Sequence, residues 1–413
     1  MTHTAPARPA PPALTPLPPE RLRGLQALLS RAVLEGVTPG ASLWIAARQG
    51  EGWRGAQLVE GRLSRAPDAA FVSAHTYYDL ASLTKPLAVS AWLWELLAAG
   101  VVTLETSVGE ALRGAAKIDD PLLARAPLWR LANHSAGLPA HRPYYDGLAH
   151  GRLSGDDPRA LKAWVRRLIS RTPCEYAPGS KSVYSDLGYL LLEWALERVS
   201  GEGLERRWGG AADGLHFRPL PPRPLSSTQL APPEARAPAE ALAPAEARAP
   251  SDDCAPTEDC PWRGGVMRGE VHDDNAWLCG GVCGHAGLFG RASDVGAWGV
   301  WLLDALAGRA PNTPAPLSAT LRDALDLRWR APERGSFVIG MDTPSPGYSS
   351  AGGGFSRWAV GHLGFTGTSL WIDLEREVVV ALLTNRVHPS RARGLEGIRW
   401  LRPAIHDEVW RAL

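Results

Sequence analysis

Strand-like segments occur near both ends of this 413-residue sequence, and a long, mostly helical stretch separates them. Residues 41–47 and 56–59 are joined by a Gly-rich turn, which predicts an N-terminal hairpin. Four segments of the same character follow near the other end: 336–341, 357–363, 368–373 and 377–384. We therefore predict an α+β fold in which both ends of the chain build one sheet, with a helical lobe inserted at about residues 82–330.

Helices are predicted next to these strands at both ends. Apolar residues recur at helical spacing over residues 19–36, and Gly36 and Pro39 end that pattern. A last helix is expected from about residue 393. The preceding residues 1–18 are rich in proline and lack the basic and apolar regions of a signal peptide, so we expect a disordered arm and a cytoplasmic protein.

Charge is nearly balanced along the chain. There are 44 Lys and Arg against 43 Asp and Glu, a formal net charge of +1, which does not favour binding to nucleic acid or to a membrane surface. The longest apolar run, 86–102, is interrupted by Ser90 and Glu95 and indicates a buried helix rather than a membrane span. A small-molecule partner is expected, and the oligomeric state is left open.

A hexapeptide repeat begins at Ala231 and reads APPEAR, APAEAL, APAEAR, APSDDC, APTEDC. Proline at every sixth position excludes a long helix, so we predict a surface insert at about residues 220–255 within a single domain of residues 19–413. Cys254 and Cys260 then correspond as copies of one position, which argues against a metal pair. Five cysteines in a chain of this length do not indicate a disulfide framework.

One serine has a lysine at the spacing that a nucleophile can use. The pattern Gly-x-Ser-x-Gly is absent, which argues against an α/β-hydrolase. Ser-x-x-Lys occurs once, as Ser82 to Lys85, and at the start of a helix these positions share one face. Because this chain uses 40 Arg and only 4 Lys, a lysine in an apolar segment suggests a need for a titratable amine. Burial and the helix end would lower its pKa.

Several segments in order strengthen this hypothesis: DLASLTKPL, LANHSAGLP, EYAPGSKSVYSDLGYLLL, GEVHDDNAWLCGGVCGHAGLFG and GHLGFTGTSLWIDL. Together they resemble the serine β-lactamase-related hydrolases, which include class C β-lactamases, D,D-peptidases and carboxylesterases. The resemblance covers roughly residues 20–413 apart from the insert. It implies a β-lactamase/transpeptidase-like fold, with an antiparallel sheet backed by helices, and an acyl-enzyme mechanism that needs no metal or other cofactor.

The resemblance assigns roles to the first two motifs. Ser82 is the nucleophile and Lys85 its partner. The family's Tyr-x-Asn corresponds to Tyr184-Ser185-Asp186, which lies between a Pro-Gly-Ser turn and a strongly apolar helix. Tyr-x-Asp also occurs at Tyr77 and Tyr144, so these remain rivals of Tyr184.

The third motif corresponds to His362-Leu363-Gly364, followed by Phe365. The resemblance implies that the backbone N–H groups of Phe365 and Ser82 form the oxyanion hole. Taken alone, a histidine in a strand is more often a structural hydrogen-bonding group than a catalyst. A glycine at position 364 suits a strand whose backbone must approach a substrate closely.

Two residues depart from the family pattern. Leu363 stands where the family has Thr and cannot bind the carboxylate of a penicillin or a D-Ala-D-Ala peptide, which favours a neutral ester as substrate. Asp186 stands where the family has Asn and should favour the charged form of Lys85. Tyr184, with a pKa lowered by that cation, then becomes the better candidate base.

His272, Asp273, Asp274 and His285 could be imagined as metal ligands. We expect them, and His134, to make structural hydrogen bonds instead. The leading prediction is a serine hydrolase that acts through an acyl-enzyme, favoured as an esterase. The alternatives are a β-lactamase or D,D-carboxypeptidase, and a non-catalytic binding or sensor module on the same fold.

Overall fold

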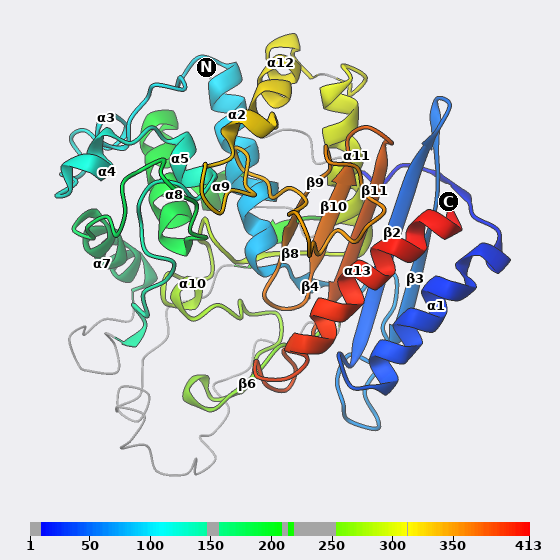
Figure 1. The fold of residues 1–413 in the computed structure, drawn as a ribbon. Coiled ribbons are helices and arrows are strands. Elements are labelled where there is room, and N and C mark those ends of the chain that lie inside the picture. Colours follow the sequence, from blue (N-terminus) through cyan, green and yellow to red (C-terminus); the bar gives the residue numbers. More distant parts are fainter. Residues whose placement is uncertain (1–9, 147–156, 209–213, 219–252, 312) are drawn as a thin grey trace.

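Both ends of the chain meet in one six-stranded sheet (Figure 1). The computed structural model describes residues 10–146, 157–208, 214–218, 253–311 and 313–413. The strand order is β1-β3-β2-β11-β10-β9. These strands are β1 (Leu14–Pro16), β2 (Gly40–Gln49), β3 (Gly52–Gly61), β9 (Val360–Leu363), β10 (Ser369–Asp373) and β11 (Val378–Thr384). The predicted α+β fold, with a sheet built from both termini, is confirmed.

The pairing of β2 with β11 joins the two ends of the chain. Leu43 in β2 lies opposite Leu382 in the antiparallel partner β11. β10 then pairs with β11 on one side and with β9 on the other, so that His362 lies opposite Leu370. This order carries the third predicted motif to the edge of the sheet.

Helices cover both faces of the sheet because residues along β2 alternate between two cores. Leu43 and Ile45 pack in the core beneath α1 (Pro19–Leu34) and α13 (Leu395–Ala412). Trp44 and Ala46 face the other core, where α11 (Ala292–Leu306) contacts the sheet. Figure 1 shows α1 and α13 side by side on their face. Both terminal helices lie close to their predicted bounds.

The predicted strand at 336–341 is wrong. Val338 and Ile339 are buried, but the segment forms a tight turn in which the Val338 N–H donates to the Met341 carbonyl. Gly340 has a φ of +98° and lies against Ser90 of the helical lobe. Burial therefore explains the apolar run, while the turn prevents an extended ladder.

The predicted disordered arm is also wrong in part. Residues 14–16 form β1, which pairs in parallel with β3, and Leu17 is buried below the sheet's edge. The proline at position 16 sits on an edge strand, where a missing N–H is tolerated. Residues 1–9 lie outside the described residues.

Helices of 4 to 15 residues make up most of the inserted lobe. They are α2 (Ala91–Ala98), α3 (Val108–Ala111), α4 (Pro121–Arg125), α5 (Trp129–Ala132), α7 (Pro158–Ser170), α8 (Asp186–Ser200), α9 (Leu204–Trp208), α10 (Asp274–Leu278) and α12 (Ala315–Ala324). A small sheet of β4 (Tyr78–Asp79), β8 (Leu288–Gly290) and β5 (His216–Phe217) lies within the same stretch of chain. None of the helices in the described ranges is long and apolar enough to cross a membrane.

Residues 219–252, which include most of the hexapeptide repeat, lie outside the described residues. The end of the fourth copy and the whole last copy are described and differ from the predicted surface loop. Cys254 and Ala255 are buried, and Cys254 packs against Tyr77 and Phe289. Residues 259–260 form β6, which pairs with β7 (Gly265–Val266). Cys254 and Cys260 are free thiols.

Candidate active site

Ser82 lies in a tight 3₁₀ turn that directly precedes the helices of the lobe. The turn, η1 (Ala81–Leu83), is followed by η2 (Lys85–Ser90) and then by α2. Asp79 fixes its entry, because one carboxylate oxygen accepts from the Ala81 N–H at 2.8 Å and the other from the His272 N–H at 2.6 Å. The Ser82 side chain is thereby held, partly exposed, at the wall of a cavity.

Lys85 lies beneath Ser82 and is completely buried. Its ammonium group donates to three oxygens: Ser82 Oγ at 2.9 Å, Asp186 Oδ1 at 2.7 Å and the His285 carbonyl at 3.0 Å. The predicted contact between the serine and the lysine is therefore present in the structure.

The charge of Lys85 is stabilised by its surroundings. Burial by itself lowers the pKa of Lys85, but the charge of Asp186, with smaller contributions from Tyr184, raises it above the ordinary value. Burial opposes the ionisation of Asp186, yet Lys85 and His141 hold its pKa well below the usual range. The sequence-based expectation of a lowered pKa for Lys85 is wrong, because the effect of Asp186 exceeds that of burial. The expectation that Asp186 favours the charged form of Lys85 agrees with the raised pKa.

Tyr184 and Asp186 reach the cavity because they flank the start of α8. Ser185 caps this helix: its hydroxyl accepts from the Gly188 N–H and donates to the Pro139 carbonyl. The Tyr184 ring packs at a tilt of 40° against His134, with 4.4 Å between centroids, and Lys85 Nζ lies 4.9 Å from the centre of the Tyr184 ring.

The rival tyrosines lie elsewhere. Tyr144 is buried with its ring edge against Trp164, and Tyr77 is buried beside Cys254. Neither lines the cavity that contains Ser82. Of the three tyrosines that begin a Tyr-x-Asp tripeptide, only Tyr184 lines the cavity with Ser82.

The proton of Tyr184 is held more tightly than the sequence suggests. Burial of the phenol raises its pKa, and the opposing effect of the Lys85 ammonium does not restore the ordinary value. The expected lowering of this pKa is therefore wrong, because Asp186 offsets part of the effect of Lys85. Tyr184 is a neutral phenol at rest.

The third motif forms the opposite wall from the end of β9. His362 is buried, and its Nδ1 lies 2.9 Å from the Leu363 carbonyl, so Nδ1 carries the proton and donates it. Burial lowers the pKa of His362 to about 3, which keeps the ring neutral. A Cβ added at Gly364 would lie 2.6 Å from the Leu80 carbonyl, so the backbone that follows β9 lies close to the Ser82 turn.

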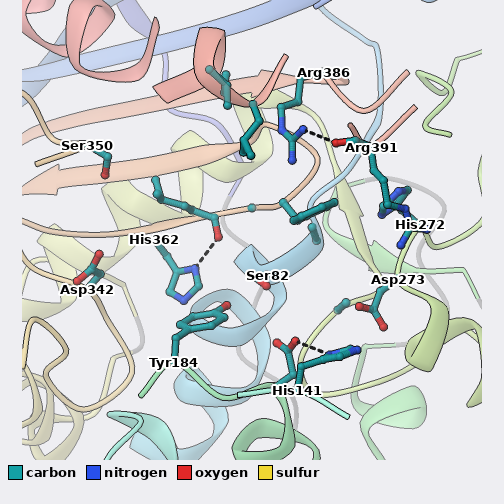
Figure 2. A pocket seen from close by; sticks show the side chains of 18 of the residues that line it. Ser82, His141, Tyr184, His272, Asp273, Asp342, Ser350, His362, Arg386 and Arg391 are labelled. Carbon is teal, nitrogen blue, oxygen red and sulfur yellow. Dashed lines mark hydrogen bonds and ion pairs between the residues drawn. The ribbon is translucent and has the colours of Figure 1, made fainter. Parts of the chain in front are cut away.

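These residues surround one cavity of about 630 Å³ (Figure 2). Its wall includes six of the seven predicted site residues, and Lys85 lies just below: Ser82, Tyr184, Asp186, His362, Gly364 and Phe365. Phe365 is 50% exposed and stacks beneath the Arg386 guanidinium, 4.7 Å from its ring centre. Apolar and charged surfaces thus adjoin next to the nucleophile.

Sequence reasoning missed several residues of the cavity wall. His141 lies on the loop after α5, 3.5 Å from Asp186, while Arg386, Arg391 and Arg402 follow β11 or lie in α13. Loop residues carry no periodic signal, and single arginines do not stand out in a chain with 40 of them. No signal in the sequence could have selected them.

The imagined metal ligands make ion pairs and hydrogen bonds. His285 pairs with Asp273 at 2.8 Å, and His272 lies 3.2 Å from Glu258. Asp274 pairs with Arg263 and Arg391 instead. Within the described part of the chain, no three His, Cys, Asp or Glu side chains are grouped as a metal site would require.

Comparison with known proteins agrees with this geometry. The family model described as Beta-lactamase matches residues 25–401. A protein of Escherichia coli O157:H7 named "Putative D-alanyl-D-alanine carboxypeptidase" is 29% identical over 388 residues, covering 89% of this chain and 83% of that protein. A protein of the same name from E. coli K12 is 29% identical over 328 residues, covering 76% of this chain and 70% of its own length.

Solved structures share the fold at low sequence identity. A penicillin-binding protein homologue from Caulobacter crescentus superposes with a TM-score of 0.64 at 16% identity, covering 97% of this chain and all of that one. EstCE1, described as a hydrolase with promiscuous acyltransferase activity, has a TM-score of 0.62 at 19% identity, covering 94% and 98%. With a family model that spans nearly the whole chain, the conclusion is that this protein belongs to the Beta-lactamase family and is a serine hydrolase.

Proposed function

We propose that this enzyme cleaves an ester or amide bond through a covalent acyl intermediate on Ser82. The observation that supports it best is the 2.9 Å hydrogen bond between Lys85 and Ser82 at the wall of the cavity. Ser82 Oγ attacks the substrate carbonyl, and water later releases the acyl group. The N–H groups of Ser82 and Phe365 are the proposed donors to the oxyanion.

Tyr184 is suited to the second half of the acylation step. A neutral phenol on the cavity wall can give its proton to a departing amine or alkoxide, and the adjacent Lys85 ammonium stabilises the phenolate that results. His362 stays neutral and acts by hydrogen bonding rather than by charge.

The charges on the cavity wall indicate an anionic group in the substrate. Arg386 is buried, and its Nη1 donates to the carbonyls of Arg391 and Arg393. Arg402, also buried, donates to the carbonyls of Gly364 and Thr368, and neither guanidinium pairs with a carboxylate among the described residues. A cation that is desolvated and not neutralised locally favours a bound anion.

Of the four carboxylates on the wall of this cavity, three have cations of their own, and the fourth, Asp342, lies on the His362 side, away from Arg386 (Figure 2). Asp186 pairs with Lys85, Asp273 with His285, and Asp274 with Arg391. Figure 2 shows Arg386 on the side of Ser82 opposite to His141. The positive charge is therefore concentrated at one end of the cavity.

This arrangement changes the expected substrate class. The Leu363 side chain supplies no hydrogen-bond donor to a carboxylate, as the sequence predicts. Arg386, on the segment that follows β11, supplies such a donor instead. We therefore propose a substrate whose leaving group carries a free carboxylate, as a C-terminal D-amino acid does. The names of the two E. coli relatives are consistent with this proposal.

Hydrolysis of neutral esters is the second candidate function. Leu363, Phe337 and Phe365 give the cavity a substantial apolar surface next to Ser82. A short neutral acyl group could bind there without any contact to the arginines.

The two candidate functions differ in whether the rate depends on a negative charge at the C-terminus of the substrate. We expect kcat/KM for N-acetyl-D-Ala-D-Ala to exceed that for the same peptide with a C-terminal amide by about 10- to 150-fold, since a hydrogen bond to a charged group contributes about 1.5–3 kcal/mol. Arg386→Gln should remove most of this preference. Arg399→Gln, which removes an exposed cation from the same wall, should change it by no more than about threefold.

Other outcomes decide between the functions. Equal rates for the acid and the amide, with faster hydrolysis of p-nitrophenyl acetate, would favour the esterase. Labelling of Ser82 without turnover of any of these substrates would favour the binding or sensor module.

A further inference from the structure

The hydrogen bonds around Lys85 restrict how Ser82 can lose its proton. An ammonium group has three protons, and Lys85 has three oxygen acceptors within 3.0 Å. Ser82 Oγ is one of these acceptors. In this state Lys85 has no lone pair with which to take the serine proton, so it must give up a proton in the same step.

The three acceptors are not equivalent as destinations for that proton. Ser82 is the proton's source, and the backbone carbonyl of His285 is a very weak base. Asp186 is a carboxylate, 2.7 Å from Lys85 Nζ, and its second oxygen lies 3.5 Å from His141 Nδ1. The residue that stands where the related hydrolases have Asn is therefore the one basic group in direct contact with Lys85 among the described residues.

We propose that Asp186 is the final acceptor of the Ser82 proton, reached through Lys85, and that His141 tunes this acceptor. The inference rests on the acyl-enzyme function proposed above. Asp186 acts through Lys85 and is in this sense a positioning residue rather than one that touches the substrate.

The proposed transfer balances in atoms and charge. The Ser82 Oγ–H bond breaks as Oγ bonds to the substrate carbonyl carbon, and the carbonyl electron pair moves onto its oxygen. The serine proton moves to Lys85 Nζ while another Nζ proton moves to Asp186 Oδ1. When the leaving group takes the proton of Tyr184, Asp186 returns its proton through Lys85 to the phenolate, and all three side chains recover their starting states.

His141 controls how readily Asp186 takes the proton. Its side chain is 44% exposed, so it exchanges protons with solvent, and it faces the oxygen of Asp186 that Lys85 does not use. A charged His141 stabilises the carboxylate and weakens its affinity for a proton. Acylation should therefore be slower when His141 is protonated. Asp186 raises the pKa of His141 above 6.5, so the change should occur above that pH.

Other charged or titratable groups face this pair from the surrounding elements. They are Lys85, His134, Tyr184, Asp273, His285 and His362. Asp273 and His285 form a pair of opposite charges. His134 and His362 have strongly lowered pKa values because of burial and stay neutral. Among these groups, His141 is therefore the one expected to change charge between pH 6.5 and the higher pH at which His285 loses its proton.

The test is the pre-steady-state burst of p-nitrophenyl acetate, measured from pH 5.5 to 9.5. Nitrophenolate needs no proton to leave, so the burst rate reports the removal of the serine proton and not the donation by Tyr184. Asp186→Asn restores the residue of the related hydrolases with almost no change in shape. We expect its burst at pH 7 to be about 100-fold slower, the lower end of a general-base contribution. Its rate should rise with pH as Lys85 itself loses a proton.

Glu193→Gln is the matched control. Glu193 also forms a buried ion pair with a lysine, Lys162, but that pair does not touch Ser82. This variant should lower the melting temperature while keeping the wild-type pH profile of the burst. His141→Gln should remove the wild-type step above pH 6.5 and leave a flatter profile.

Three results would overturn the proposal. The first is an Asp186→Asn burst within fivefold of wild type at pH 7. The second is a decrease in the Asp186→Asn burst rate that is the same at every pH, because it would indicate a structural role for Asp186. The third is a wild-type step that persists in His141→Gln. If wild type itself gives no burst, or an adduct away from Ser82, the proposed function has failed instead.

Discussion

Replacing Gly364 by alanine should open the proposed oxyanion hole without altering any polar side chain. A Cβ at this position would lie 1.9 Å from Thr368 Oγ1 and 2.6 Å from the Leu80 carbonyl oxygen. Leu80 immediately precedes the turn that carries Ser82. Since the second contact is with backbone, a side-chain rotation cannot relieve it, and β9 must move away from the turn.

The size of this movement sets the expected loss. Non-bonded heavy atoms pack best at about 3.5 Å, so β9 and the Ser82 turn must separate by roughly 0.9 Å. The Phe365 N–H would move with β9, which would stretch one of the two proposed donor contacts beyond hydrogen-bond length. Loss of one such donor costs about 2.7–4 kcal/mol, so kcat should fall by about 10²- to 10³-fold. Overpacking should also destabilise the fold by about 1–3 kcal/mol.

The assay compares kcat on p-nitrophenyl acetate with the melting temperature. Gly353→Ala is the control, because the nearest atom to its added Cβ would be Asp407 Oδ1 at 3.9 Å. Gly364→Ala combined with Thr368→Ala relieves only the side-chain clash and should not restore activity. A Gly364→Ala enzyme that keeps half of the wild-type kcat would refute the reasoning.

Three further predictions concern charge and proton transfer. Lys85→Arg should be nearly as inactive as Lys85→Ala in the same ester assay, because a guanidinium keeps the charge but does not exchange protons; an active Lys85→Arg enzyme would show that only the charge matters. Tyr184→Phe should slow hydrolysis of amides at least tenfold more than that of p-nitrophenyl esters, because nitrophenolate leaves without a proton; equal losses would contradict the role as acid. Despite the opposing effect of burial, Asp273 raises the pKa of His285 to about 10. The stability from this pair is therefore full below pH 6.5 and lost as pH rises through about 10. Chemical denaturation at pH 7 and pH 10.5 should show a loss that His285→Gln lacks, and an equal loss in both proteins would contradict it.

Much of the sheet was predictable from the sequence because β2, β10 and β11 are buried over most of their length. The β2 segment is apolar on both faces, and β10 and β11 are fully buried, so each appears as a compact apolar run between turn residues. The same logic misassigned 336–341, because a buried turn and a buried strand have the same composition. β1 is held in place by backbone pairing with β3 rather than by an apolar run of its own. A proline-rich sequence does not indicate that such a pairing will form.

The candidate site was predictable where the chemistry is carried by residues close in sequence. Ser82 and Lys85 are three positions apart, and Tyr184 and Asp186 flank one helix start, so the members of each pair stay close, while the family resemblance selected Tyr184 among three similar tripeptides. Contacts between distant loops carry no such signal, which is why His141 and Arg386 were missed. The pKa of Tyr184 was predicted in the wrong direction because the extent of burial depends on the whole fold.

Intact-protein mass spectrometry tests the acyl-enzyme on Ser82 most directly. Wild type, quenched with acid within the burst of p-nitrophenyl acetate, should gain one acetyl group, and peptide mapping should locate it on Ser82. Ser82→Ala should gain none and should lose turnover by several orders of magnitude while keeping its melting temperature. An acetyl group on another residue, or turnover by Ser82→Ala above a tenth of wild type, would contradict the account.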